Sequence, residues 1–103
     1  MRPVLFNDEA EKSVLGACLI DRDAALTAVS LLKEHMFYNP KHRCIFATVC
    51  ALVQAADRPV DMTTVGAQLG KSLKVAGGYS YLTELCNFVP TAANIQSYAA
   101  TVR

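Results

Sequence analysis

The sequence predicts an all-α fold, a compact bundle of about six helices. No segment alternates apolar and polar residues over a long stretch, whereas several windows repeat apolar residues at intervals of three and four. Alanine, the strongest helix former, occurs 15 times, and apolar residues make up 52% of the 103 residues against 18% charged ones. We therefore expect one folded domain without strands.

Acidic residues mark the start of the first helix. Asn7 or Asp8 can cap it, and Glu9 and Glu11 fall in its opening turn, where carboxylates suit the positive end of the helix dipole. Asp8, Glu9 and Glu11 are therefore expected to stabilise this helix rather than to act as catalytic acids or bases.

The next two helices are set off by cap residues. Segment 21–23 (DRD) breaks the first pattern and caps a second helix, which ends before a loop at 34–39. The expected apolar stripe of this second helix consists of Leu26, Val29, Leu31 and Leu32. Asn39 and Pro40 then read as the cap and first residue of a third helix that runs to about residue 56.

Three further helices complete the pattern. Asp61 caps a helix over 62–69, and Gly70 fits the left-handed position that closes it. A fifth helix covers 79–88. Thr91 caps a last helix whose apolar pattern is still running at residue 103, so we expect the chain to continue beyond this point.

The sequence contains no recognisable catalytic, cofactor or metal motif. Segment 65–72 (VGAQLGKS) approaches a phosphate-binding loop, but it has three residues between its glycines where that loop has four, and no strand precedes it. His35 and His42 pair with no cysteine at a metal-binding interval. The cysteines form no C-x-x-C pair and are expected to be buried, reduced thiols: Cys18, Cys44, Cys50 and Cys86.

Charge and hydropathy favour a protein partner. The net charge of +1 supplies no broad field for nucleic acid. The densest basic cluster is Lys41, His42 and Arg43, for which we expect solvated or capping-loop contacts, with His42 and Arg43 packing in the head; phosphate or partner contact is the alternative. The longest apolar run, 14–20, is too short to cross a membrane, and no secretory signal is visible, so we expect a cytoplasmic protein. A mean hydropathy of +0.24 leaves apolar residues for a contact surface.

Two other classes of protein remain as alternatives. Segment 61–88 can be read as a helix-turn-helix of a stand-alone DNA-binding regulator, but its second helix, 79–88, contains no Lys or Arg and one Glu84. A small helical enzyme is the third possibility, and no nucleophile with a base partner at a diagnostic spacing supports it.

A series of short motifs resembles the N-terminal domain of bacterial replicative DNA helicases of the DnaB family. The motifs follow that family's order almost from end to end of the chain. They are 7–11 (NDEAE), 13–16 (SVLG), 37–38 (FY), 42–43 (HR), 45–46 (IF), 59–61 (PVD), 64–65 (TV), 77–78 (GG), 81–82 (YL), 89–90 (VP), 92–95 (AANI), 98–99 (YA) and 102–103 (VR). Any one of these alone is weak, but several in series are specific.

The resemblance implies a single helical domain of a longer helicase, with a head over about 1–90 and the first helix of a helical hairpin over about 91–103. It implies self-association, as a dimer in isolation and within a hexamer in the parent, and docking of primase and, in some species, of a helicase loader. ATP and Mg²⁺, strand separation and DNA contact would belong to a C-terminal domain that this chain lacks.

Five residues are candidates for the protein interface. Aromatic residues near a turn and a helix without its hairpin partner should leave area to bury against another copy of the chain. The candidates are Tyr79, Phe88, Ile95, Tyr98 and Val102.

Overall fold

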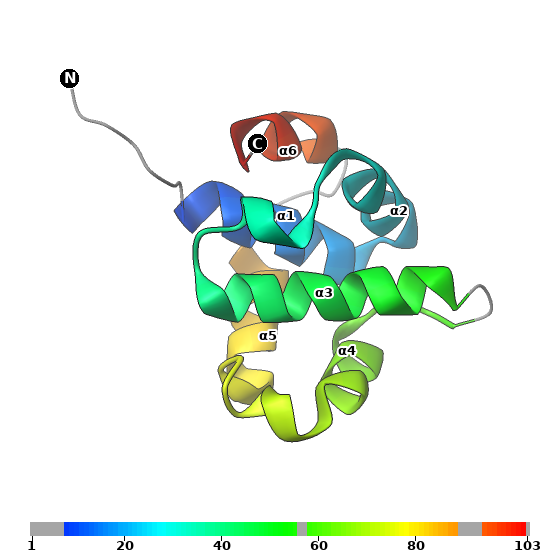
Figure 1. Cartoon of the computed structure of the whole chain (residues 1–103), viewed down its shortest axis with the longest axis vertical. Coiled ribbons are helices and arrows are strands. Elements are labelled where there is room, and N and C mark those ends of the chain that lie inside the picture. The colour runs from blue at the N-terminus through cyan, green and yellow to red at the C-terminus, as the bar shows by residue number, and fades with distance from the viewer. Residues whose placement is uncertain (1–7, 56–57, 89–93, 103) are drawn as a thin grey trace.

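The computed structural model describes residues 8–55, 58–88 and 94–102, and within them it confirms the all-α prediction (Figure 1). Six α-helices and two short 3₁₀ helices follow one another along the chain. They are α1 (Asp8–Ile20), α2 (Arg22–Leu31), η1 (Glu34–Met36), α3 (Pro40–Gln54), α4 (Met62–Leu69), η2 (Gly70–Leu73), α5 (Gly78–Phe88) and α6 (Ile95–Val102).

Helix α1 is the centre of the molecule. It contacts α2, α3, α5 and α6, and an unbroken run of its residues, from Val14 to Leu19, is buried. A helix that is apolar around most of its circumference can be stabilised only by neighbours on several sides. Figure 1 shows α6 on one side of α1 and α5 on the other, with the long helix α3 running in front of α5, away from α6.

The predicted caps are present where the structure describes them. The Asn39 side chain accepts a hydrogen bond from the Lys41 backbone N–H at 2.9 Å, and Pro40 is the first residue of α3. The Asp61 carboxylate accepts from the Thr64 N–H at 2.8 Å, and the Thr64 hydroxyl accepts from the Asp61 N–H at 2.9 Å. These reciprocal bonds satisfy backbone donors that the first turn of α4 cannot satisfy itself.

The predicted apolar stripe of α2 is wrong at one position. Leu26 is 42% exposed, whereas Ala24, Ala25 and Ala28 are almost completely buried, together with Leu32 just beyond the helix. Small side chains allow α2 to approach α1, α3 and α6 closely, so the alanine face packs inward and the larger Leu26 points away.

Several expectations fall outside the described residues. These concern the cap at Asn7, the end of the third helix at residue 56, the cap at Thr91 and the continuation at Arg103. In the loop predicted at 34–39, the chain forms the single turn η1. Among the described residues, no helix has the length and apolarity that crossing a bilayer requires.

Candidate functional site

The five predicted interface residues do not form one continuous surface. Tyr79 and Phe88 are nine residues apart on α5, which places them about 180° apart around the helix axis. Tyr98 lies on α6, which packs on α1 and α2. Ile95 is only 7% exposed and belongs to the core, because it faces the rest of the bundle at the start of α6.

Tyr79 rests on a glycine of the neighbouring helix. A Cβ atom built on Gly66 of α4 would lie 2.2 Å from Tyr79 Cε1, so the ring occupies the space that any other residue at position 66 would fill. The other side of Tyr79 remains open, and the residue is 45% exposed. Segment 65–72, which approaches a phosphate-binding loop in sequence, thus uses Gly66 for packing and Gly70, at φ 53°, to end α4.

Phe88, at the other end of α5, is 38% exposed and is partly covered by a cation. Lys12 Nζ lies 4.5 Å from the centre of the Phe88 ring and 2.8 Å from Glu84 Oε2. The two contacts join α1 to α5, although the exposed Lys12–Glu84 pair adds little stability by itself.

The exposed aromatic and aliphatic residues extend beyond the predicted set. The other large apolar side chains that are well exposed are Ile20, Leu26, Tyr38 and Val75. Helical periodicity identified none of these as surface residues, because Ile20 and Leu26 sit within apolar patterns, while Tyr38 and Val75 lie outside the α-helices. Val14 and Leu15, by contrast, are completely buried.

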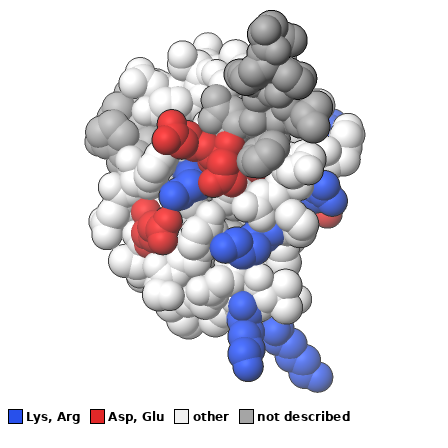
Figure 2. All heavy atoms as spheres, turned by 90° about the vertical axis from the view of Figure 1, so that its left-hand side faces the viewer, with Lys and Arg blue, Asp and Glu red and all other residues white. Residues whose placement is uncertain are grey.

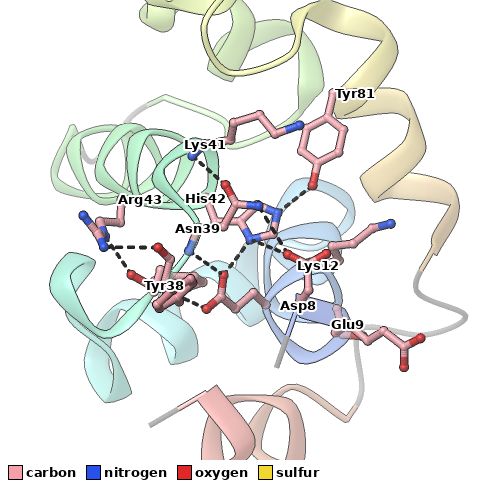
Figure 3. A network of polar contacts seen from close by, with 12 residues as sticks. Asp8, Glu9, Lys12, Tyr38, Asn39, Lys41, His42, Arg43 and Tyr81 are labelled. Carbon is pink, nitrogen blue, oxygen red and sulfur yellow. Dashed lines mark hydrogen bonds and ion pairs between the residues drawn. The ribbon is translucent and has the colours of Figure 1, made fainter. Parts of the chain in front are cut away.

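A buried network of polar side chains connects three helices (Figure 3). Glu11 of α1 and His42 of α3 are 2% and 0% exposed, and Glu11 Oε1 lies 2.7 Å from His42 Nδ1. His42 Nε2 lies 2.6 Å from the hydroxyl of Tyr81 on α5. A carboxylate can only accept, so His42 Nδ1 carries a proton and donates to Glu11, while His42 Nε2 makes the second hydrogen bond of the ring with the Tyr81 hydroxyl.

Glu11 also organises the chain that enters α3. Its Oε2 accepts the Tyr38 N–H at 2.7 Å, and its Oε1 accepts the Asn39 N–H at 3.3 Å. Glu11 lies in the first turn of α1, as expected, and in addition it binds backbone groups outside its own helix. The carboxylate is buried because it satisfies backbone donors of a segment that lies 27 and 28 residues further along the chain.

The basic cluster packs around the same segment. Arg43 donates from Nε to the Phe37 carbonyl at 2.7 Å and from Nη2 to the Tyr38 carbonyl at 3.1 Å, while Lys41 Nζ lies 4.1 Å from the centre of the Tyr81 ring. His42 is a core residue. Arg43 thus holds the turn before α3, His42 packs in the core, and Lys41 lies against Tyr81 of α5.

Tyr81 and three of the cysteines favour their neutral forms. Burial, with the negative charges of Asp8, Glu84 and Glu11 in support, raises the pKa of Tyr81 to about 12. The expectation that all four cysteines are buried holds for Cys18 but is wrong for Cys44, Cys50 and Cys86, which are only partly buried. Burial raises the pKa of the Cys18 thiol most strongly, and it raises those of Cys50 and Cys86 as well. These thiols therefore lack the thiolate character of reactive cysteines.

The fold and its surface define the chain as a small α-helical domain built on one central helix, in which a buried polar network joins the helices within an otherwise apolar core. The chain belongs to the family of DnaB-like helicase N-terminal domains, whose family model matches residues 4–103. This match confirms the resemblance to that family indicated by the series of short sequence motifs.

Known relatives agree with this assignment. The chain is 46% identical over 98 residues to the replicative DNA helicase DnaB of Geobacillus stearothermophilus and 41% identical over 98 residues to the replicative DNA helicase DnaC of Bacillus subtilis. These matches include 91% and 93% of this chain but only 21% of each relative.

A solved structure shares the architecture. The crystal structure of the N-terminal domain of DnaB helicase from Mycobacterium tuberculosis superposes with a TM-score of 0.90 at 36% sequence identity. The match covers 94% of this chain and 71% of that one. The fold described above is thus the fold of that domain.

Proposed function

We propose that this chain is the non-catalytic collar domain of a cytoplasmic replicative DNA helicase. In this role it holds helicase subunits together and offers a docking surface for primase and, in species that use one, for a helicase loader. The observation that carries the proposal is the family membership, combined with exposed aromatic residues on a domain of nearly neutral charge.

The mechanism is contact between apolar surfaces. Tyr79 and Phe88 offer rigid rings that lose little rotamer entropy when they are buried, which is why aromatic residues are enriched among energetically important interface positions. Tyr98 and Val102 on α6 are only partly buried, and they form a second candidate contact on the other side of α1. Because Tyr79 and Phe88 lie on opposite sides of α5, the candidates offer separate contacts at Tyr79, at Phe88 and on α6, and a domain with several contacts can bind a sibling copy and another protein at once.

Catalysis belongs to the parent helicase in this proposal. The relatives are replicative DNA helicases of which this chain spans about a fifth, so ATP and Mg²⁺ binding, strand separation and DNA contact are assigned to the remaining length. The helix-turn-helix alternative gains no support, because α5 presents no Lys or Arg among its residues.

The proposal is tested by measuring the molar mass of the chain. Multi-angle light scattering at high micromolar concentration should show a dimer for the wild type, weakened in Tyr79→Ala. Tyr38→Ala is the matched control, because Tyr38 is a similarly exposed tyrosine outside the candidate set. Circular dichroism should show that both variants remain folded.

Two results would contradict this account. If the wild type and both variants are monomers, the proposed self-association surface is contradicted. Loss of primase binding in a folded Arg43→Glu variant, with normal binding by Tyr79→Ala and Phe88→Ala, would move the docking surface from α5 to the start of α3.

A further inference from the structure

Three side chains of metal-ligand type converge at the start of α1. Asp8 and Glu11 are three residues apart and so share one side of the helix, while His42 reaches them from the first turn of α3 (Figure 3). One carboxylate oxygen from each acid and Nδ1 of His42 all lie within 4.8 Å of one another. We propose that Asp8, Glu11 and His42 bind a divalent transition-metal ion, with zinc as the best match.

The distances require only small side-chain movements. His42 Nδ1 lies 2.7 Å from Glu11 Oε1 and 3.9 Å from Asp8 Oδ1. Zinc bonds of about 2.0–2.2 Å at tetrahedral angles place ligand atoms roughly 3.2–3.6 Å apart. The Glu11–His42 pair therefore opens by about half an ångström or more, and Asp8 moves in toward His42 by a similar amount. The Asp8 and Glu11 oxygens, which lie within 4.8 Å of each other, close by up to about 1.2–1.6 Å.

The partners that orient metal ligands are already in place. Metal-bound histidines hold their second ring nitrogen with a hydrogen bond, and His42 Nε2 has the Tyr81 hydroxyl at 2.6 Å. When the ion takes the position of the Nδ1 proton, the neutral ring carries its proton on Nε2 and donates to Tyr81. Glu11 Oε2 stays bonded to the Tyr38 N–H, which leaves Oε1 to face the ion.

Access and charge favour an ion at this place. The Asp8 side chain is 45% exposed, whereas those of Glu11 and His42 are 2% and 0% exposed, so an ion enters past Asp8 and keeps water as a further ligand. The two carboxylates of Asp8 and Glu11 would be compensated by an ion of charge +2. Nearby, Lys12 pairs with Glu84. Lys41 lies over the Tyr81 ring (Figure 3).

This site revises the expectation that the chain holds no metal. That expectation rested on spacing in sequence, and His42 is 31 residues from Glu11. The proposal is independent of the collar function, because binding of the ion involves a single copy of the chain.

The test is a titration of the apo chain, prepared with a chelator, with ZnCl₂ in isothermal calorimetry and in thermal unfolding. Asp8→Asn removes a carboxylate ligand but keeps an oxygen that accepts from Asn39 Nδ2, so its fold should survive. Glu9→Gln is the matched control, since it neutralises an exposed acid in the same turn. The wild type and Glu9→Gln should bind one zinc ion and unfold at a higher temperature with zinc.

Asp8→Asn should bind zinc about 10- to 100-fold more weakly, at least the loss seen when an outer partner of a ligand is removed. Co²⁺ should give visible bands without thiolate charge transfer, and zinc should shift the His42 ring signals in NMR. Three results would overturn the proposal: no binding at millimolar zinc, equal affinity in wild type and Asp8→Asn, or a cobalt–thiolate band.

Discussion

At the scale of single residues, Glu11 has the most partners in the buried network. It is a buried carboxylate, and its two oxygens accept from the Tyr38 N–H, the Asn39 N–H and the His42 ring. Burial of a charge is tolerated only when it is hydrogen-bonded in this way. A substitution that changes even one atom of this carboxylate should therefore lower the free energy of unfolding of the whole domain.

Glu11→Gln tests this conclusion. An amide has only one acceptor oxygen, so its NH₂ group faces either the Tyr38 N–H or the Asn39 N–H, and one backbone donor loses its partner. We expect the free energy of unfolding, measured by urea denaturation, to fall by about 1–3 kcal/mol. Glu9→Gln, an exposed neighbour, should change it by less than about 0.5 kcal/mol, and equal effects of the two variants would contradict this role of Glu11.

Tyr81 gives a prediction about alkaline pH. Its pKa is about 12 in the folded chain against 10.0 for the unperturbed group, so the unfolded state loses the proton first as the pH rises. The stability that this group contributes is fully present below pH about 10 and is lost as the pH rises through about 12. Between these pH values, the urea concentration at the unfolding midpoint should fall less steeply with pH for Tyr81→Phe than for the wild type. Parallel plots of midpoint against pH would show that Tyr81 ionises normally.

At the scale of elements, the contact between α4 and α5 depends on a glycine inside a helix. Glycine is unfavourable in a helix interior, yet Gly66 leaves the space that the Tyr79 ring occupies. The same ring is also a candidate interface residue. One face of the Tyr79 ring therefore serves packing within the domain, and the other face is exposed to a partner.

A double-mutant cycle measures this dependence. Gly66→Ala alone should gain little stability, because the new methyl group displaces Tyr79 from α4. In the Tyr79→Ala background the same substitution should stabilise by about 0.5–1 kcal/mol, since only the helix preference of alanine then remains. Thermal or urea unfolding of the four proteins gives the coupling, and additive effects would show that Tyr79 does not rest on Gly66.

At the scale of the whole molecule, local signals predicted the helices, and long-range contacts decided the rest. Caps at Asn39 and Asp61 and the stop at Gly70 were readable, because each acts within a few residues of itself. The Glu11–His42–Tyr81 network was not, since its members are separated by 31 and 39 residues and no spacing rule links them. Leu26 was misplaced for a related reason, because periodicity does not say whether a leucine face or an alanine face packs inward.

The distribution of charged residues agrees with a protein partner held by complementary shape rather than by a strong electrostatic field. Figure 2 shows Lys, Arg, Asp and Glu residues scattered over one face, with large areas of uncharged surface between them. The interface candidates could be named from the sequence as aromatic residues near a turn. Their division between two sides of α1 could not, because it depends on how α5 and α6 pack.

The carboxylate of Glu11 also has a consequence for hydrogen exchange. Tyr38 has an exposed ring, but its amide proton is held by a carboxylate from α1, 27 residues away in sequence. That proton can be released to deuterium only when α1 separates from the segment before α3. It should therefore exchange as slowly as the amides in the middle of α1 and report the opening of the entire bundle from a position on its surface.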